Sequence, residues 1–187
     1  MSCAVVLRIE NEGKPEVWLG ADAYATKESG SLHVDSEPKI IDIPGGAMVC
    51  LGRRTDSQAL QTGVLPKPLG EGANQNWVVA VWIPAAKRLL REHGLLKVEN
   101  GVESVEIDLI LVFGDWFCVI DGEDFQVMRP SCGYGAIGSG SAFALGAIHA
   151  GSYHCSAQDR LRGALCAAAE FNARVGPPFE IRRVWPR

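Results

Sequence analysis

The sequence lacks a long basic run, a signal peptide and a membrane span, each of which would indicate a particular class of function. It has no long basic run, and its formal net charge at pH 7 is -4. Because nucleic-acid-binding domains normally carry a basic patch or stripe, we expect no nucleic-acid partner. The opening stretch MSCAVVLRIENEG holds a short apolar run followed by charges, which is neither a signal peptide nor a membrane span. We therefore expect a cytosolic (cytoplasmic) protein that does not bind membranes.

Cysteine pairs with metal-binding or redox spacing are also missing. The six cysteines are scattered, and none forms a Cys-x-x-Cys pair. In a reducing cytosol, isolated cysteines are usually small buried apolar residues. His149, His154 and Cys155 come closest to a zinc pattern, but no second pair of ligands lies nearby. We favour core or surface roles for these three residues.

The chain contains no internal repeat, low-complexity stretch or clear domain boundary. Its 187 residues are enough for one domain with a substantial core. Hydrophobic residues make up 47% and charged residues 21%, which is typical of a globular protein. We expect a single domain over residues 1–187.

Hydrophobic patterning predicts separate runs of strands and of helices, which indicates a layered α+β fold rather than alternating βαβ units. The expected strands cover residues 3–9, 15–22, 39–43, 47–52, 104–114, 116–122, 124–130, 134–137 and 179–185, and the expected helices cover residues 53–61, 76–94, 141–151 and 156–176.

Local signals predict where several helices begin and end. Thr55 or Asp56 is expected to cap the first helix, and Ser156 the last. Pro84 lies inside the second helix, which predicts a kink or a late start, and Gly94 is expected to end that helix.

The stretch GYGAIGSGSAFALGAIHA joins a glycine-rich segment to a helix pattern. Gly133, Gly135 and Gly138 spell the dinucleotide-binding pattern GxGxxG, which also requires an acid about 20 residues further on. Asp159 is near that distance, but it falls in the first turn of a predicted helix, and the remaining chain is too short for a doubly wound sheet. We set this reading aside. A simpler alternative is that the glycines allow a sharp strand-to-helix turn and that Ser139 caps the helix.

Ser2 follows the initiator methionine directly. Because serine is small, we expect Met1 to be removed, which would make Ser2 the free N-terminal residue. An N-terminal serine can act as nucleophile while its own amine takes the proton. That chemistry requires an N-terminus held inside a sheet, and the strand-like stretch SCAVVLRI fits this requirement.

At this point the chain resembles the proteasome β-type family, and within it the bacterial HslV-like subunits. The resemblance covers nearly the whole chain and is carried by the order and spacing of SCAVVLRI, VWLGADAYAT, KI, LGRRTD, AIGSGSAFALGAI and ALCAAAEFNARVG. It implies the four-layer αββα sandwich of N-terminal nucleophile hydrolases, in which two antiparallel sheets face each other and helices cover both outer faces.

The resemblance also implies roles for individual residues. Ser2 would be the nucleophile and its amine the general base, with Lys39 as a cation that lowers the pKa of that system. Asp22 would pair with Lys39. Ser139 would hydrogen-bond the Ser2 amine and help to relay the proton, and the Gly52 N–H would stabilise the oxyanion. Taken singly, Lys39 also fits a solvated surface residue, Asp22 a turn cap and Ser139 a helix cap.

Three further points follow from the resemblance. Ala169, Asn172 and Val175 match the spacing at which family members bind a Na⁺ or Mg²⁺ ion through carbonyl oxygens, although the chemistry itself requires no cofactor. Two residues depart from the family pattern. Serine replaces the usual threonine nucleophile, and Arg53 replaces the glycine that follows the oxyanion glycine.

The activity implied by the resemblance is that of a peptidase subunit that cuts peptides or unfolded proteins. Such subunits would assemble into a homo-oligomeric ring or double ring, with an ATP-dependent unfoldase as a partner. Two alternatives stay open: a non-catalytic assembly subunit that retains Met1, and an amidase acting on a small molecule. Cys3 is a second candidate nucleophile if one more residue is removed.

Overall fold

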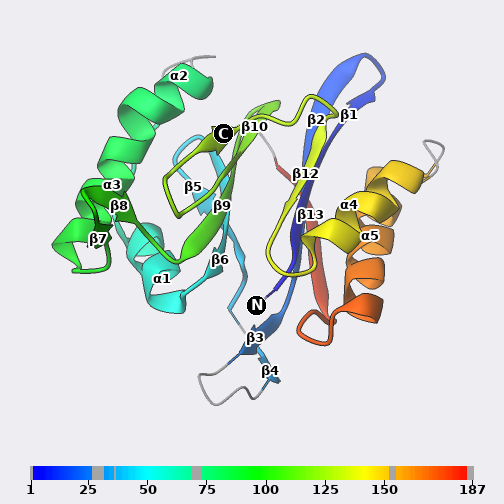
Figure 1. The fold of residues 1–187 in the computed structure, drawn as a ribbon. Coiled ribbons are helices and arrows are strands. Elements are labelled where there is room, and N and C mark those ends of the chain that lie inside the picture. Colours follow the sequence, from blue (N-terminus) through cyan, green and yellow to red (C-terminus); the bar gives the residue numbers. More distant parts are fainter. Residues whose placement is uncertain (1, 27–31, 36, 69–72, 152–154, 185–187) are drawn as a thin grey trace.

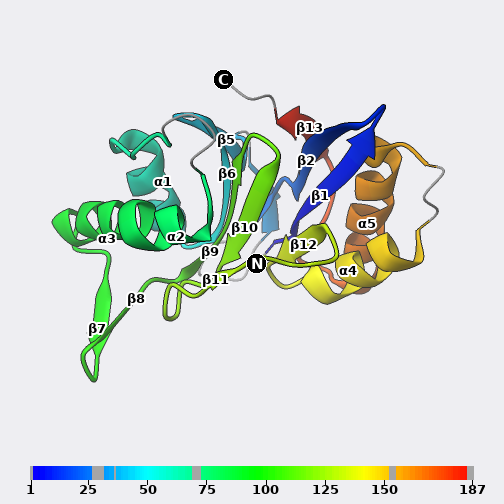
Figure 2. The ribbon, with the colours of Figure 1, turned by 90° about the horizontal axis from the view of Figure 1, so that it is seen from above.

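The chain folds into a sandwich of four layers, with two antiparallel sheets in the middle and helices on both outer faces (Figures 1 and 2). This architecture is that of a computed structural model, which describes residues 2–26, 32–35, 37–68, 73–151 and 155–184. The α+β class and the αββα layering predicted from the sequence are confirmed.

The first sheet contains the N-terminal strand and has the order β12-β1-β2-β13. Its strands are β1 (Ala4–Asn11), β2 (Lys14–Asp22), β12 (Tyr134–Ile137) and β13 (Phe179–Val184). Each neighbouring pair is antiparallel, and β1 lies between β2 and β12. This central position places the residues just before β1 next to the end of β2 and the start of α4.

The second sheet has the order β11-β10-β9-β6-β5 and is also antiparallel. Its strands are β5 (Ile40–Ile43), β6 (Gly46–Gly52), β9 (Ile107–Phe113), β10 (Trp116–Ile120) and β11 (Val127–Met128). The strands predicted at residues 39–43 and 47–52 pair as the hairpin β5–β6, and those predicted at residues 104–114 and 116–122 pair as the hairpin β9–β10.

The helices on the second sheet come from the middle of the chain (Figure 1). They are α1 (Arg54–Thr62), and one continuous helix made of α2 (Gln75–Trp77), a π-helical turn (Val78–Trp82) and α3 (Ile83–Glu92). Pro84 lies in the first turn of α3, directly after the π-helical turn. The predicted irregularity is therefore a widened turn, which accommodates a residue that lacks a backbone N–H.

The first sheet is covered by α4 (Ser141–Ala150) and α5 (Ala157–Phe171), as Figure 2 shows. Two short hairpins were not predicted. One is β3–β4, which pairs Tyr24–Thr26 with Leu32–Val34, and the other is β7–β8, which pairs Lys97–Glu99 with Val102–Ser104. Their strands are too short to show a clear alternation of apolar and polar residues.

The core consists of three apolar layers, and side-chain alternation along the strands assigns residues to them. In β1, Val6 packs between the two sheets, whereas Val5 and Leu7 face α4 and α5. In β9, Ile110 faces the other sheet and Leu111 faces the helices. Because both faces of these strands are buried, they appear in the sequence as continuous apolar runs.

The helix ends agree with the sequence signals in most places. Ser156 caps α5 by accepting a hydrogen bond from the Asp159 N–H. Gly94 adopts a φ of 67° directly after the C-cap of α3. The predicted cap of α1 is wrong, because the N-cap is Arg53 and makes no side-chain capping bond, while Asp56 lies buried in the first turn. No helix within the described part of the chain is long and apolar enough to cross a membrane.

Candidate functional site

Ser2, Asp22 and Lys39 meet at one end of the sandwich, where β1 starts, β2 ends and β5 begins. Lys39 Nζ donates to Ser2 Oγ at 2.7 Å and to Asp22 Oδ1 at 2.7 Å. It also donates to the main-chain oxygen of Tyr24 at 2.6 Å, and this oxygen accepts a second bond, from Ser2 Oγ, at 3.2 Å. All three donors of the lysine ammonium group therefore have a partner.

Asp22 is held by the backbone as well as by Lys39. Its side chain has no exposed surface, yet Oδ1 accepts from the Cys3 N–H at 3.1 Å and Oδ2 from the Tyr24 N–H at 3.2 Å. The Asp22 N–H donates to the Cys3 carbonyl. A buried carboxylate is destabilising unless it is paired and hydrogen-bonded, and here both conditions hold. Asp22 thus fixes the ammonium group of Lys39 relative to the start of β1.

Burial changes the acid–base properties of this cluster. Desolvation lowers the pKa of Lys39, and the neighbouring Asp22 carboxylate partly opposes that decrease. For Cys3, burial and the Asp22 charge raise the pKa of the thiol to about 12. Cys3 is also fully buried in the layer under α4 and α5. A thiol in that environment stays protonated and out of reach, which argues against Cys3 as the nucleophile.

The corner between β12 and α4 packs against Ser2. Ser139 Oγ donates to the Ser2 carbonyl oxygen at 3.4 Å, and the Gly140 N–H donates to the same oxygen at 3.4 Å. The N-cap of α4 is Gly140 and no side chain caps that helix, so the reading of Ser139 as a simple helix cap is wrong. Ser139 does face Ser2, while its predicted bond to the Ser2 amine stays a prediction.

Gly138 is required at this corner for two reasons. Its φ is 85°, a conformation that favours glycine, and a Cβ atom there would lie 2.4 Å from the Ser2 carbonyl oxygen. The glycines of the GSG segment therefore allow a close approach of the chain to Ser2. The GxGxxG match itself is not a dinucleotide motif, because β12 lies inside it and runs antiparallel to β1.

The turn after α5 supports the same corner. Asn172 Nδ2 donates to the Ser139 carbonyl at 2.8 Å, and Asn172 Oδ1 accepts from the Arg174 N–H. The Asn172 carbonyl accepts from the Val175 N–H at 2.9 Å. The cation site predicted at the carbonyl oxygens of Ala169, Asn172 and Val175 stays a prediction. The sequence predicted a role only for the Asn172 carbonyl oxygen and not for its side chain, which holds the Ser139 carbonyl.

Tyr24 is another residue that the sequence could not identify. It contributes its main-chain oxygen to Lys39 and its N–H to Asp22. Every residue carries these backbone groups, so no residue type signals such a role. The hairpin formed by β3 and β4, which begins at Tyr24, was itself not predicted.

Gly52 ends β6 and faces the cavity that contains Ser2. Its φ is 138°, and a Cβ atom would lie 2.0 Å from the Glu106 carbonyl oxygen, so only glycine fits. The next residue, Arg53, donates its N–H to that same oxygen. Gly52 thus lines the same cavity as Ser2, and the donation of its N–H to an oxyanion stays a prediction.

Asp56 packs under this turn, and its side chain has no exposed surface. Burial raises the pKa of its carboxyl group, while Arg53 and hydrogen bonds from Thr55 and the Glu106 backbone partly oppose the increase. The folded protein therefore holds the Asp56 proton more tightly than the unfolded chain does. The stability that this proton provides is present at low pH and is lost as the pH rises through the raised value.

We accordingly expect Asp56→Asn to flatten the dependence of stability on pH. The measurement is the free energy of urea unfolding at a series of pH values from the ordinary carboxyl range to neutrality. As the pH rises, the free energy of unfolding should decrease more for wild type than for the variant, because asparagine does not ionise. A difference that is constant with pH would contradict the raised pKa of Asp56.

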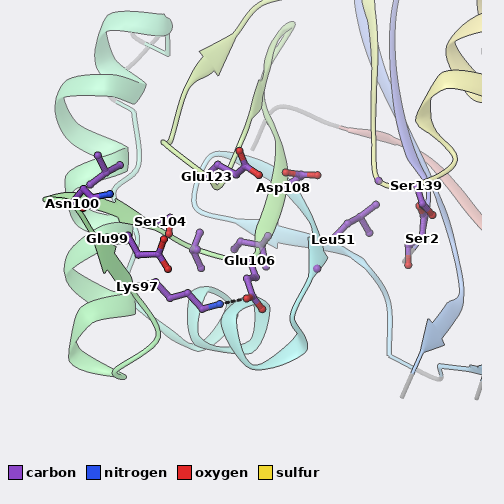
Figure 3. Close-up of a pocket in the computed structure, with 15 residues that line it drawn as sticks. Ser2, Leu51, Lys97, Glu99, Asn100, Ser104, Glu106, Asp108, Glu123 and Ser139 are labelled. Atoms are coloured by element: carbon purple, nitrogen blue, oxygen red, sulfur yellow. Dashed lines mark hydrogen bonds and ion pairs between the residues drawn. The ribbon is translucent and has the colours of Figure 1, made fainter. Parts of the chain in front are cut away.

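A cavity of about 790 Å³ opens beside Ser2, in the size range of small-ligand sites (Figure 3). One end is lined by Ser2, Gly138 and Ser139, and Leu51 and Gly52 form part of its wall. The far side is formed by the β7–β8 hairpin and the start of β9. The predicted nucleophile therefore faces a space that can hold a substrate.

The residues of the weak zinc pattern lie elsewhere. His149 Nδ1 is 2.8 Å from the hydroxyl of Tyr134, and Cys155 is exposed. His154, Met1 and Trp185 lie outside the described residues. Among the residues that are described, no group of three or more His, Cys, Asp or Glu side chains could hold a metal ion.

Two facing antiparallel sheets between helical layers match the fold of N-terminal nucleophile hydrolases of the proteasome β type. Ser2 lies next to a buried Lys–Asp pair at one end of this fold. Solved structures confirm this fold. Thiobacillus denitrificans BPH in complex with epoxomicin has 24% identity and a TM-score of 0.76, with 98% of each chain covered. A second BPH structure from that organism has 23% identity and a TM-score of 0.77, covering 98% of this chain and 97% of that one.

HslV from Trypanosoma brucei is also similar, at 19% identity and a TM-score of 0.68, with 98% of this chain and 99% of that chain covered. The resemblance to HslV-like subunits stated from the sequence is thus confirmed at the level of the fold. No protein-family model matches the sequence, and no curated protein matches it significantly.

Proposed function

We propose that this chain is a peptidase subunit that uses Ser2 as its nucleophile after Met1 has been removed. The observation that carries the proposal is the position of Lys39 Nζ, which bonds to Ser2 Oγ at 2.7 Å while Asp22 holds it from the other side. A solvated surface lysine would not be buried in this way, since its side chain is only 12% exposed.

The reaction proceeds by acyl transfer. The free amine of Ser2 accepts the hydroxyl proton, and Oγ attacks the carbonyl carbon of the scissile peptide bond. The oxyanion that forms is stabilised by the Gly52 N–H. When the intermediate collapses, the C–N bond breaks, the leaving amine takes the proton, and an ester remains on Ser2. Water then attacks this ester, releases the acid product and regenerates the hydroxyl group.

Lys39 favours this reaction electrostatically. As a cation within hydrogen-bonding distance of Oγ, it stabilises the developing alkoxide and so lowers the pKa of the hydroxyl group. The Tyr24 carbonyl and the Asp22 carboxylate keep the ammonium group in one position. No reorganisation is then needed when the negative charge forms on Oγ.

Ser2→Ala is expected to remove peptide cleavage, whereas Ser2→Thr should retain it, because threonine supplies the same hydroxyl group and amine. Intact mass spectrometry must first show that Met1 has been removed from each protein. Cleavage of an internally quenched peptide mixture is then measured. Loss of Met1 with no cleavage by wild type would favour the non-catalytic alternative, and cleavage that persists in Ser2→Ala would place the nucleophile elsewhere.

We also propose that the subunits assemble into a homo-oligomeric ring or double ring around the cavities. The proposal of a ring is supported by the fold and by a pair of exposed aromatic side chains on the helices that cover the first sheet. Phe143 of α4 and Phe171 of α5 are 42% and 67% exposed and stack on each other with ring centroids 5.4 Å apart. Exposed aromatic pairs of this kind favour contact with another protein surface. An ATP-dependent unfoldase remains the partner that the resemblance implies.

A further inference from the structure

The cavity beside Ser2 is strongly acidic on the side away from the nucleophile. Its lining includes the carboxylates of Glu99, Glu106, Asp108 and Glu123 and a single basic side chain, Lys97 (Figure 3). These acids do not define a site by themselves. They matter because they share one cavity with Ser2, whose side chain is the candidate nucleophile and whose exposed fraction is only 8%.

The four carboxylates are not equivalent. Glu106 is neutralised, since it forms ion pairs with Arg53 at 2.8 Å and with Lys97. In the part of the chain that the structure describes, no basic side chain pairs with the other three acids, Glu99, Asp108 and Glu123. Lys97, the single lysine of the lining, is therefore already paired with Glu106, and the remaining acids leave a net negative surface facing the cavity.

Asp108 lies in a part of this wall that is both partly buried and negatively charged. It is half-buried on β9, and burial together with the charges of Asp121 and Glu123 raises the pKa of its carboxyl group. Figure 3 shows the Asp108 and Glu123 side chains on the same side of the cavity, and the Glu123 charge contributes to the raised pKa of Asp108. A positively charged group placed between this wall and Ser2 would relieve the repulsion.

A metal ion does not fit this arrangement. The described acids form no group of three that converges on one point, so they are spread along the wall instead. Carboxylates spread along the wall of a cavity suit an organic cation, such as a lysine or arginine side chain. The cavity volume of about 790 Å³ leaves room for a peptide segment as well as that side chain.

We infer that this subunit selects peptides with a lysine or arginine side chain close to the scissile bond, and that Asp108 and Glu123 are the residues that recognise it. The inference rests on the proposed function, because it assumes that a peptide lies against Ser2. It adds a substrate class to that function and assigns specificity to two side chains that take no part in the acyl transfer.

The experiment compares pairs of internally quenched peptides that differ only in arginine or citrulline, its neutral isostere, at each position around the cleavage site. With the processed wild-type protein, kcat/KM should be about tenfold or more higher for arginine at one position, the lower end of what a focused field in a cleft provides. The preference should weaken as salt is added. Asp108→Asn and Glu123→Gln should each reduce it, while their citrulline peptides are cut at the wild-type rate.

Glu170→Gln is the matched control, because Glu170 is an exposed acid on α5. This helix covers the first sheet, whereas the acidic residues of the cavity lie on the second sheet, its adjoining loops and the β7–β8 hairpin. This variant should keep the full preference. Glu123 is exposed as well, so Glu123→Gln tests the inference even if Asp108→Asn, at a half-buried position, fails to fold. Thermal unfolding of each variant checks the fold independently of activity.

Failure of the inference and failure of the proposed function give different results. Cleavage that depends on Ser2 but is equal for arginine and citrulline peptides would overturn the inference and leave the function standing. Fluorescence anisotropy of labelled peptides with Ser2→Ala protein supplies a readout without turnover. Tighter binding of the arginine peptide that is lost in Glu123→Gln would support the inference even if no cleavage were found, and equal binding would overturn it.

Discussion

Replacing Lys39 with alanine is expected to abolish peptide cleavage, with a decrease in kcat/KM of about 10³-fold or more, as for groups that act together in one catalytic unit. The variant removes the only side chain that donates to Ser2 Oγ within the described residues. It also leaves Asp22 as a buried carboxylate without its cation. Breaking a buried pair in this way destabilises proteins by roughly 3–5 kcal/mol.

The measurement combines quenched-peptide cleavage with urea unfolding and light scattering. Lys14→Ala serves as the control, because Lys14 is an exposed lysine at the start of β2. We expect both variants to form the same many-subunit particle as wild type, since neither side chain belongs to the exposed Phe143–Phe171 pair. Turnover retained in Lys39→Ala would refute the proposed role of the lysine, and a monomeric wild type would refute the ring.

The substitution Gly138→Ala is expected to damage both stability and activity. The new Cβ atom would lie 2.4 Å from the Ser2 carbonyl oxygen, in a residue whose φ is 85°. Backbone strain of this type destabilises by about 1–3 kcal/mol. Because the corner must move away from Ser2, the nucleophile is also displaced, and a shift of about 1 Å at a reacting atom lowers rates by about 100-fold.

Gly163→Ala provides a control of the opposite sign. Gly163 lies within α5, and a Cβ atom there would meet no atom within 4 Å. Alanine in a helix interior is favoured over glycine by roughly 0.5–1 kcal/mol, so this variant should be slightly more stable and fully active. The measurement compares thermal unfolding and peptide cleavage of the two variants with those of wild type. A Gly138→Ala protein as active and stable as Gly163→Ala would show that the close contact with Ser2 is unimportant.

The strands and long helices could be predicted because they carry strong local patterns. The strands of the β1–β2 hairpin are two apolar runs on either side of a polar turn that contains glycine, and β12 was predicted with the same bounds that the structure shows. The cap of α1 was not predicted correctly, because Thr55 and Asp56 both have capping side chains but α1 already begins at Arg54. Both residues therefore lie in its first turn, where Asp56 is buried. Sequence patterns do not report which of two adjacent polar residues becomes buried.

The candidate site also contains residues that the sequence identified and residues that it did not. Ser2, Asp22, Lys39, Gly52 and Ser139 were identified from their order along the chain, and the structure brings all five to one end of the sandwich. The contributions of the Tyr24 carbonyl and the Asn172 side chain were not identified. A carbonyl oxygen is common to all residues, and an asparagine near a helix end has many ordinary roles.

The sequence by itself determined which segments form strands and helices, the layered α+β class, and the residue types available for nucleophilic chemistry, because these depend on local periodicity and on side-chain identity. Only the tertiary structure decided which of those side chains meet. Ser2 and Ser139 are far apart in the chain and become neighbours only because β12 pairs with β1. The acidic side of the cavity likewise arises from the β7–β8 hairpin and from the second sheet, while Ser2 lies just before β1 of the first sheet. The relative placement of these parts follows from core packing and not from any local pattern.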